Sequence, residues 1–245
     1  MGKIVFLGTG ASGGTPGTGK SNRRESSLLL KDRLSILLDV TRHFSKQAEC
    51  LERIDCILLT HGHADACGGI GQLRTWLKGK NAQAVPVYAH PQTIEVIRNK
   101  HKLLDHCRFH AIREGQTVKL DSWEITPLLV PHSRDPRFPA FAWKLRKDET
   151  IVYASDIAEL TEEFKSFCQG ANLLIIDGAT WRRKIFSHLR VDRDLPQVCT
   201  WKTGKIILTQ IGRSAPPHEV FTNEIRTICP RAVPAYDGLE QHITS

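Results

Sequence analysis

Two histidines and an aspartate at alternate positions form the pattern in this chain that most clearly indicates chemistry. His61, His63 and Asp65 follow an unbroken apolar run at residues 57–59, which predicts a buried strand. Glycines 68 and 69 then open a segment that predicts a helix. Imidazole nitrogens and a carboxylate at this spacing can converge on one cation if the chain turns sharply after the strand. The alternative is a polar loop whose histidines share no role.

Further stretches resemble the motifs of a known family. Residues 60–66 read Thr-His-Gly-His-Ala-Asp-Ala, close to the signature Thr-His-x-His-x-Asp-His. Val130-Pro-His132-Ser133, Tyr153-Ala-Ser-Asp156 and residues 207–213 follow in the family's order, and residues 6–14 and 37–39 also match. With these motifs the chain resembles the metallo-β-lactamase superfamily nearly end to end. It looks most like the branch that holds the cyclic phosphodiesterase of phosphonate breakdown, the PQQ-associated B protein and the tRNA 3′-processing nucleases.

The resemblance implies a first metal site that is complete in this sequence. Its ligand positions correspond to His61, His63, His132 and Asp156. Three imidazoles and a carboxylate suit Zn²⁺, and they would also suit Mn²⁺ or Fe²⁺. We therefore expect one tightly bound metal ion per chain, with zinc as the leading candidate.

The second metal site implied by the resemblance is degenerate. Asp65 and Asp156 are retained, but the last histidine of the signature is Ala66 and the late histidine is Gln210. Two carboxylates and an amide oxygen would bind zinc weakly and suit only a hard cation. We expect this site, made of Asp65 and Gln210 with the bridging Asp156, to be absent or labile. Cys67 and His218 are conceivable substitute ligands, although a buried thiol and a surface histidine are the simpler interpretations.

Asp65 and His188 are the predicted catalytic residues. Asp65 would orient or deprotonate the attacking water, as family members use this position. His188 corresponds to a histidine near the leaving group in related phosphodiesterases, where it would donate a proton or bind a phosphate oxygen. The alternative for His188 is a histidine on a mobile loop. Asp39 is expected to support a metal ligand from outside the coordination sphere.

Composition and charge favour an anionic substrate. The 245 residues are 40% hydrophobic and 24% charged, typical of a globular protein, and the formal net charge is +8. We expect a small anionic phosphate ester; nucleic acid stays open but unsupported, because aromatic residues are sparse among the basic ones. No apolar run reaches the roughly 18 residues of a membrane span, so no membrane partner is expected. The oligomeric state is not fixed, and a homodimer stays open.

The amino-terminal sequence and the cysteines predict a cytoplasmic protein. Residues 1–8 enter a strand directly and lack the layout of a signal peptide. Seven cysteines, an odd number without a Cys-x-x-Cys pair, indicate reduced thiols.

Two clusters of basic residues stand out, and one overlaps a nucleotide-binding pattern. The first cluster is Lys20, Arg23 and Arg24; the second is Arg182, Arg183, Lys184, Arg190 and Arg193. Residues 14–21 match the P-loop pattern Gly-x-x-x-x-Gly-Lys-Ser. A P-loop requires a helix directly afterwards, whereas the leucines at 28–30 predict a strand. We expect no ATPase, and a looser role for Lys20 in holding a substrate phosphate stays open.

Alternating strands and helices without a linker predict a single domain over residues 1–245. Expected strands cover 3–8, 28–30, 34–39, 57–59, 85–89, 118–120, 123–129, 140–145, 151–154, 173–177 and 205–208, and expected helices cover 44–51, 69–78, 91–101, 160–167 and 219–228. Layer rules leave a two-sheet sandwich and a doubly wound sheet open. The resemblance implies the four-layer αββα metallo-β-lactamase sandwich, of the α/β class.

These observations predict a metal-dependent hydrolase, namely a phosphodiesterase that acts on a small or cyclic phosphodiester through a metal-activated water. One alternative is a mononuclear iron enzyme resembling the sulfur dioxygenases of the superfamily. Another is a non-catalytic accessory protein of the same fold, to which the replaced ligands would point.

Overall fold

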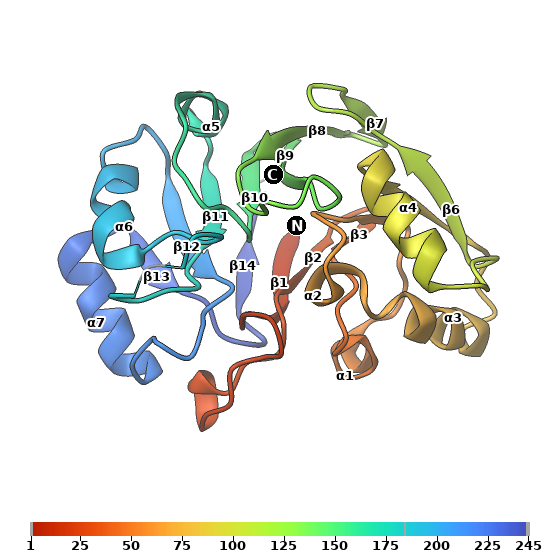
Figure 1. The fold of residues 1–245 in the computed structure, drawn as a ribbon, viewed down its shortest axis with the longest axis horizontal. Coiled ribbons are helices and arrows are strands. Elements are labelled where there is room, and N and C mark those ends of the chain that lie inside the picture. Colours follow the sequence, from red (N-terminus) through yellow and green to blue (C-terminus); the bar gives the residue numbers. More distant parts are fainter. Residues whose placement is uncertain (1, 184, 244–245) are drawn as a thin grey trace.

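The computed structural model describes residues 2–183 and 185–243, which form two seven-stranded β-sheets with helices on both outer sides (Figure 1). In spatial order, the first sheet contains β14 (Glu240–His242), β1 (Lys3–Gly8), β2 (Ser27–Lys31), β3 (Ser35–Leu38), β4 (Cys56–Leu58), β5 (Val85–Ala89) and β6 (Cys107–Ala111). The second contains β13 (Ala232–Pro234), β12 (Lys205–Thr209), β11 (Leu173–Asp177), β10 (Thr150–Ala154), β9 (Ala140–Arg146), β8 (Trp123–Val130) and β7 (Val118–Leu120).

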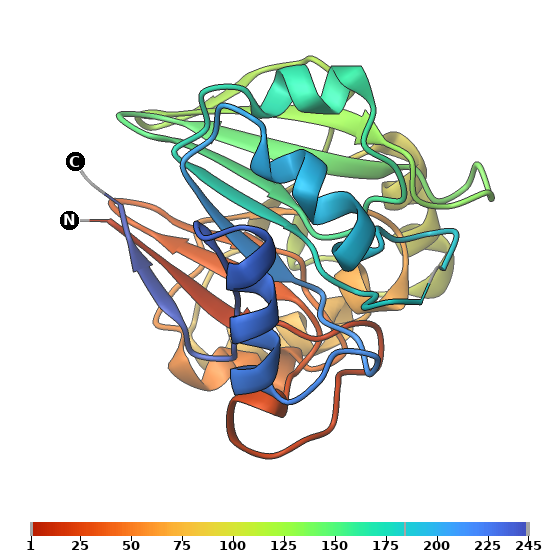
Figure 2. The ribbon, with the colours of Figure 1, turned by 90° about the vertical axis from the view of Figure 1, so that its left-hand side faces the viewer.

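Helices cover the outer face of each sheet. Those on the first sheet are α1 (Phe44–Gln47), α2 (Ala64–Cys67), α3 (Ile70–Gly79) and α4 (Pro91–Lys100). Those on the second are α5 (Glu162–Cys168), α6 (Val191–Cys199) and α7 (His218–Ile228). Figure 2 shows β1 and β14 side by side, and α6 and α7 on the face turned toward the viewer. None of the helices in the described ranges has the length and apolarity that crossing a bilayer requires.

The alternation of side chains along the strands accounts for the four layers. Leu28 and Leu30 of β2 pack between the two sheets, whereas Leu29 packs against the outer helices. In β12, Ile207 points between the sheets, while Ile206 and Leu208 join the core beneath α5–α7. Because a strand buried on both faces needs apolar residues at every position, these strands read as continuous apolar runs. The predicted αββα fold of the α/β class is confirmed.

The elements that the sequence did not predict are short or polar. The strand β14, Glu-Gln-His, contains no apolar residue, and it forms by antiparallel backbone pairing with β1. The strand β6 lies at the other edge of the same sheet and is largely exposed. The strand β13 and the helix α6, which contains Pro196, were also missed. The helix expected at 44–51 is instead α1 followed by a 3₁₀ turn, Ala48–Cys50.

Two cysteines correct the expectation of uniformly reduced thiols. Cys199 and Cys229 form a disulfide, with Cα atoms 5.7 Å apart. Cys199 ends α6 and Cys229 directly follows α7, and these helices pack against each other. The pairing depends on tertiary packing across 30 residues of sequence, so local spacing gave no sign of it. Cys50, Cys56, Cys67, Cys107 and Cys168 are free thiols.

Candidate metal centre and active-site cleft

The predicted metal ligands lie at the carboxyl ends of strands from both sheets. His61 and His63 follow β4, His132 follows β8, and Asp156 follows β10. Gln210 directly follows β12, the second parallel neighbour of β10 across β11. Because parallel strands end at the same edge of a sheet, the residues that follow them are brought together. The edge thus collects side chains that lie far apart in sequence.

A sharp turn after β4 directs the signature residues into this edge. Asp39, at φ 64°, accepts hydrogen bonds from the backbone N–H of Thr60 at 2.8 Å and from its hydroxyl at 3.0 Å. The short helix α2 then begins directly after His63. Gly69 closes the turn: a Cβ there would lie 2.1 Å from the Thr41 carbonyl oxygen, so only glycine fits.

The three imidazoles converge on one point. His132 Nε2 lies 3.3 Å from His63 Nδ1, and the His61 ring centroid is 4.7 Å from that of His63 and 4.9 Å from that of His132. Asp156 Oδ1 is 3.9 Å from His132 Nε2. Nitrogens that each bind zinc at about 2.1 Å are separated by up to about 4 Å, so these spacings match ligands of one ion.

Hydrogen bonds fix the ring tautomers in the state that metal binding requires. The Thr60 hydroxyl donates to Asp39, so it accepts the Nδ1 proton of His61 at 2.9 Å. His132 Nδ1 donates to the Ser187 carbonyl at 2.9 Å. Both Nε2 atoms therefore present lone pairs to the centre, and His61 Nε2 is buried without a hydrogen-bond partner. An orphaned buried nitrogen at the focus of this cluster fits a divalent metal ion.

Burial favours the neutral form of His61 and His63. It lowers the pKa of His61 to about 3 and also lowers the pKa of His63. Asp156 behaves in the opposite way: burial acts to raise its pKa, but the neighbouring His61, His132 and His188 hold it below the usual range. Neutral imidazoles beside an ionised carboxylate are the protonation states that bind a metal.

At the predicted second metal site, an amide group binds both carboxylates. Gln210 Nε2 donates to Asp156 Oδ1 at 2.8 Å and to Asp65 Oδ2 at 3.2 Å. Gln210 adopts a left-handed backbone conformation, φ 57°, and its N–H donates to the Ser26 hydroxyl at 2.8 Å. Burial and the charge of Asp156 raise the pKa of Asp65 to about 6. The amide thus lies between the two carboxylates that would otherwise share a second cation.

Neither conceivable substitute ligand reaches the centre. Cys67 is buried, and its thiol donates to the His63 carbonyl at 3.2 Å. His218 lies elsewhere, where its Nδ1 is 3.1 Å from Arg23 Nη2. Within residues 2–183 and 185–243, the clusters with metal-ligand spacing are drawn from His61, His63, Asp65, His132, Asp156 and His188. Cys67 and His218 therefore act as structural residues.

His188 faces the metal cluster as an ion pair with Asp177. Its Nδ1 lies 2.6 Å from Asp177 Oδ2, and its ring is 5.2 Å from that of His132. Burial acts to lower the pKa of His188, but the Asp177 carboxylate outweighs it and raises the pKa to about 9. A histidine that is protonated at neutral pH is a proton donor and a poor metal ligand.

Asp177 is the functional candidate that the sequence did not reveal. It ends β11, and its carboxylate also accepts the backbone N–H groups of Ile157 at 3.1 Å and Ala179 at 2.7 Å. The sequence offered one signal, the apolar run at residues 173–176 that ends in this aspartate. Only the packing of residues 185–188 over the end of β11 shows its partner.

A cleft of about 460 Å³ gives access to these residues. Its lining includes Ser12, His63, Asp65, His132, Asp156, Phe186 and His188. Phe186 is 58% exposed, and the Arg134 guanidinium lies 4.6 Å from its ring centroid. This volume lies within the range of sites for small molecules.

The basic residues after β11 are largely paired. Arg190 bonds Asp192 at 3.0 Å, Arg193 bonds Asp194 at 2.7 Å, and Arg182 lies 3.6 Å from Glu224. Arg183 is exposed, and Lys184 lies outside the described residues. This cluster therefore supplies less free positive charge than its sequence suggests.

The P-loop pattern does not form a phosphate cradle. Gly19–Ser21 is a single 3₁₀ turn, and the strand β2 follows it in place of a helix. The N–H groups of Gly13, Gly14 and Thr15 donate to Glu25, Ala11 and Arg23. The pattern therefore lacks the following helix whose N-terminus a P-loop uses to bind phosphate.

Comparison with known proteins identifies the family. Residues 36–209, more than half of the chain, match the family model of the β-lactamase superfamily domain. The chain belongs to the metallo-β-lactamase branch of that superfamily. It is similar to the structure of a diphosphatase from the PhnP family, with a TM-score of 0.86, 22% identity, and coverage of 100% of this chain and 98% of that one. It is also similar to zinc-bound PqqB from Methylobacterium extorquens, with a TM-score of 0.81, 18% identity, and coverage of 98% and 100%.

One curated relative is longer than the chain. The octanoyltransferase of Porphyromonas gingivalis is 24% identical over an alignment 267 positions long, which covers 97% of this chain and 51% of that protein. The chain therefore spans about half the length of this relative.

Proposed function

We propose that the protein is a hydrolase of small anionic phosphodiesters, cyclic ones included, that uses a single divalent metal ion. His61, His63, His132 and Asp156 would hold the ion, with zinc as the leading candidate and manganese or iron as alternatives. The observation that carries the proposal is the buried, unpartnered Nε2 of His61 within the cluster of His61, His63, His132 and Asp156. The zinc-bound state of the similar PqqB structure supports zinc.

The side chains around the cluster divide the acid–base work. A divalent metal in this position supplies Lewis acidity for a water and a phosphoryl oxygen. Asp65, with its pKa raised to about 6, is ionised at neutral pH and basic enough to accept a proton from the attacking water. His188, with its pKa raised to about 9, is protonated and donates to the departing alkoxide oxygen. Asp177 holds His188 in place and keeps it protonated.

Charge and similarity support a phosphate substrate. The net charge of +8 favours anions. Among the similar structures, one is named a diphosphatase and others are an RNase Z and PDE1, both from yeast. The cleft is lined by His188 as well as the metal cluster, so an anionic phosphoryl group would meet positive charge on both sides.

Gln210 supports a single metal. Its Nε2 donates hydrogen bonds to both carboxylates that would bridge or bind a second ion. A donor –NH₂ group offsets part of their negative charge without offering a lone pair to a cation. Ala66 contributes no ligand atom from the facing helix α2.

The test is hydrolysis of a panel of phosphodiesters by protein loaded with one equivalent of zinc, manganese or iron. We expect turnover of at least one linear or cyclic diester with one of these metals, and a His61→Ala variant that neither retains the metal nor turns over substrate. Fully loaded protein that hydrolyses no diester would contradict the proposal. One iron per chain with persulfide-dependent oxygen uptake would instead support the dioxygenase alternative.

A further inference from the structure

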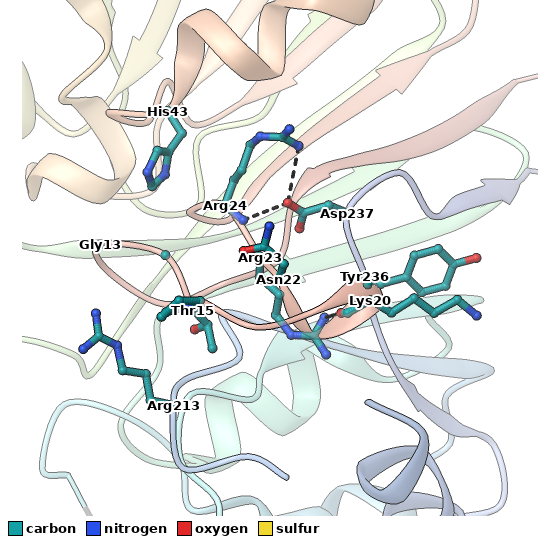
Figure 3. Close-up of a pocket in the computed structure, with 13 residues that line it drawn as sticks. Gly13, Thr15, Lys20, Asn22, Arg23, Arg24, His43, Arg213, Tyr236 and Asp237 are labelled. Atoms are coloured by element: carbon teal, nitrogen blue, oxygen red, sulfur yellow. Dashed lines mark hydrogen bonds and ion pairs between the residues drawn. The ribbon is translucent and has the colours of Figure 1, made fainter. Parts of the chain in front are cut away.

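A second cavity, larger than the cleft, lies on the other side of the glycine-rich loop. Its volume is about 760 Å³, and its lining includes Gly13, Lys20, Arg23, Arg24, His43, Arg213, Tyr236 and Asp237 (Figure 3). Four cationic side chains thus face a single carboxylate. The proposed reaction uses none of these residues, so the cavity requires a separate explanation.

The charged residues in this cavity differ in whether other protein groups already bind them. Arg23 is 5% exposed, and it donates to the Ala235 carbonyl at 3.0 Å and contacts His218. Arg24 pairs with Asp237 at 3.5 Å, and this carboxylate also accepts the Thr9 hydroxyl at 2.8 Å. These two arginines therefore hold the walls of the cavity together.

Arg213 and Lys20 form no ion pair among the described residues. Both are exposed, and among the described residues neither has a carboxylate within ion-pair distance. Lys20 lies over the Tyr236 ring, 4.6 Å from its centroid. In the view of Figure 3, Arg213 and His43 lie on either side of the loop at its Gly13 end, whereas Lys20 lies beside Tyr236 at the other end. The cavity therefore presents free positive charge at both ends.

The backbone that carries Arg213 is held in place. Ile211 donates its N–H to the Thr9 carbonyl at 2.8 Å, and the Ser214 hydroxyl accepts the Trp181 N–H at 2.9 Å. Between them, Gly212 packs so closely that a Cβ would lie 2.3 Å from the Ala179 carbonyl oxygen. A cation on a fixed turn binds an anion at a smaller entropic cost than one on a mobile loop.

The cavity and the metal cleft share a wall. Ser12 lines the cleft and Gly13 lines the cavity, and consecutive Cα atoms are about 3.8 Å apart. Arg213, which lines the cavity, lies three residues after Gln210, which contacts the metal cluster. The Cα atoms of these two residues are therefore at most about 11 Å apart. The Arg42 guanidinium donates to the hydroxyl of Ser12, the residue that lines the cleft, at 3.1 Å. One extended molecule can therefore occupy both.

We propose that this cavity binds a second phosphate group of the substrate, so that the natural substrate carries at least two phosphates, one at the metal and one beside Arg213. The proposal rests on the proposed function for the first phosphate. Arg213 supplies a planar pair of N–H donors that matches a phosphate, and Lys20 adds a point charge. A solvated basic surface with no ligand is the alternative that the experiment must exclude.

The test compares nucleotides with one and two phosphates as product-like ligands of the metal-loaded protein. The probes are thymidine 3′,5′-bisphosphate, thymidine 3′-monophosphate and thymidine 5′-monophosphate, and the readout is affinity by calorimetry. We expect the bisphosphate to bind about tenfold more tightly than either monophosphate, a gain that shrinks as salt screens the charges. Equal affinity for all three would overturn the proposal.

Two matched variants locate the effect. Arg213→Ala should remove most of the gain from the second phosphate, whereas Arg226→Ala, which deletes an exposed arginine from α7, should retain it. Thermal melting confirms that both variants fold. The same gain in both variants would place the second phosphate outside this cavity. Calorimetry measures binding and requires no turnover. If the metal-loaded protein hydrolyses no diester, the proposed function is refuted, and the affinity for the bisphosphate still tests whether this cavity binds a second phosphate.

Discussion

The two halves of the candidate metal centre differ in whether their polar groups have hydrogen-bond partners. In one half, ring nitrogens of His61, His63 and His132 gather beside Asp156, and the His61 Nε2 atom has no hydrogen-bond partner. In the other half, Gln210 donates hydrogen bonds to Asp65 and Asp156, so each carboxylate has a partner without a metal. The first half is incomplete without a cation, and the second is complete.

In the proposed function, this contrast explains why the two carboxylates remain although only one metal ion is bound. Burial raises the pKa of Asp65, and repulsion by the neighbouring Asp156 carboxylate raises it further. An amide donor relieves part of the repulsion, and the carboxylate that remains ionised becomes available as a base. Under the proposed function, Ala66 and Gln210 act together: neither offers a nitrogen to a second ion, and Asp65 is left as a base beside a single ion.

The largest expected effect comes from breaking the intact half. His61→Ala removes a buried ligand, and we expect metal binding and hydrolysis to fall by more than the roughly 100-fold that even outer partners of a metal ligand can contribute. The measurement is turnover of the best diester at saturating metal. His110→Ala, an exposed histidine on the edge strand β6, should keep full activity and serves as the control. Equal loss in both variants would show a folding defect and no specific role for His61.

His188 should contribute about 10²–10⁴-fold as a general acid, and the loss should depend on the leaving group. His188→Ala should slow diesters with alkyl alcohol leaving groups strongly. Diesters that release p-nitrophenolate should suffer much less, because this anion leaves without a proton. The measurement is kcat/KM for both series. A uniform loss across leaving groups would assign His188 to phosphate binding.

Restoring the missing nitrogens should convert the second half into a metal site. The double variant Ala66→His, Gln210→His supplies two imidazoles beside Asp65 and Asp156, and we expect its metal content to rise from one to two ions per chain. Each single variant should hold one. Ala66 is 2% exposed, so some loss of melting temperature from overpacking is expected. A double variant that folds and still holds one ion would show that Gln210 and Ala66 do not exclude the second metal.

The smallest expected effect is a shift in pH dependence. The acid form of His188 is required, so kcat/KM should fall as pH rises through its pKa, which Asp177 raises to about 9. Asp177→Asn removes the raising charge and leaves burial, which acts in the opposite direction, so the fall should begin at a lower pH. The pH profile of kcat/KM measures this. Unchanged profiles would mean that the Asp177–His188 pair does not control the limiting proton.

The sequence predicted the parts of the centre that depend on local pattern. The apolar run before His61 gave the strand, and the alternate spacing of His61, His63 and Asp65 gave the first turn of the site. The contacts of His132, Asp156 and Gln210 with this turn arise from the alignment of strand ends in two sheets. Motif resemblance could supply that alignment, whereas residue periodicity could not.

What the sequence missed depends on packing between distant segments. Asp177 was visible only as the end of a strand, because its partner His188 lies in a loop that no periodicity describes. The disulfide of Cys199 and Cys229 requires two helices to lie together. The strand β14 forms through backbone pairing with β1 and the Lys3–Glu240 ion pair between the two strands. The direction of the Gln210 amide toward both carboxylates depends on a left-handed backbone that the sequence does not mark.

The most direct test is the metal content of the natively purified wild-type protein, measured by elemental analysis against protein concentration. The account predicts one divalent ion per chain, bound by His61, His63, His132 and Asp156. Two ions per chain would contradict it, because the Gln210 amide and a second cation compete for the same carboxylates. No metal after incubation with zinc, manganese or iron would contradict it as well, since His61 Nε2 would then stay buried without any partner.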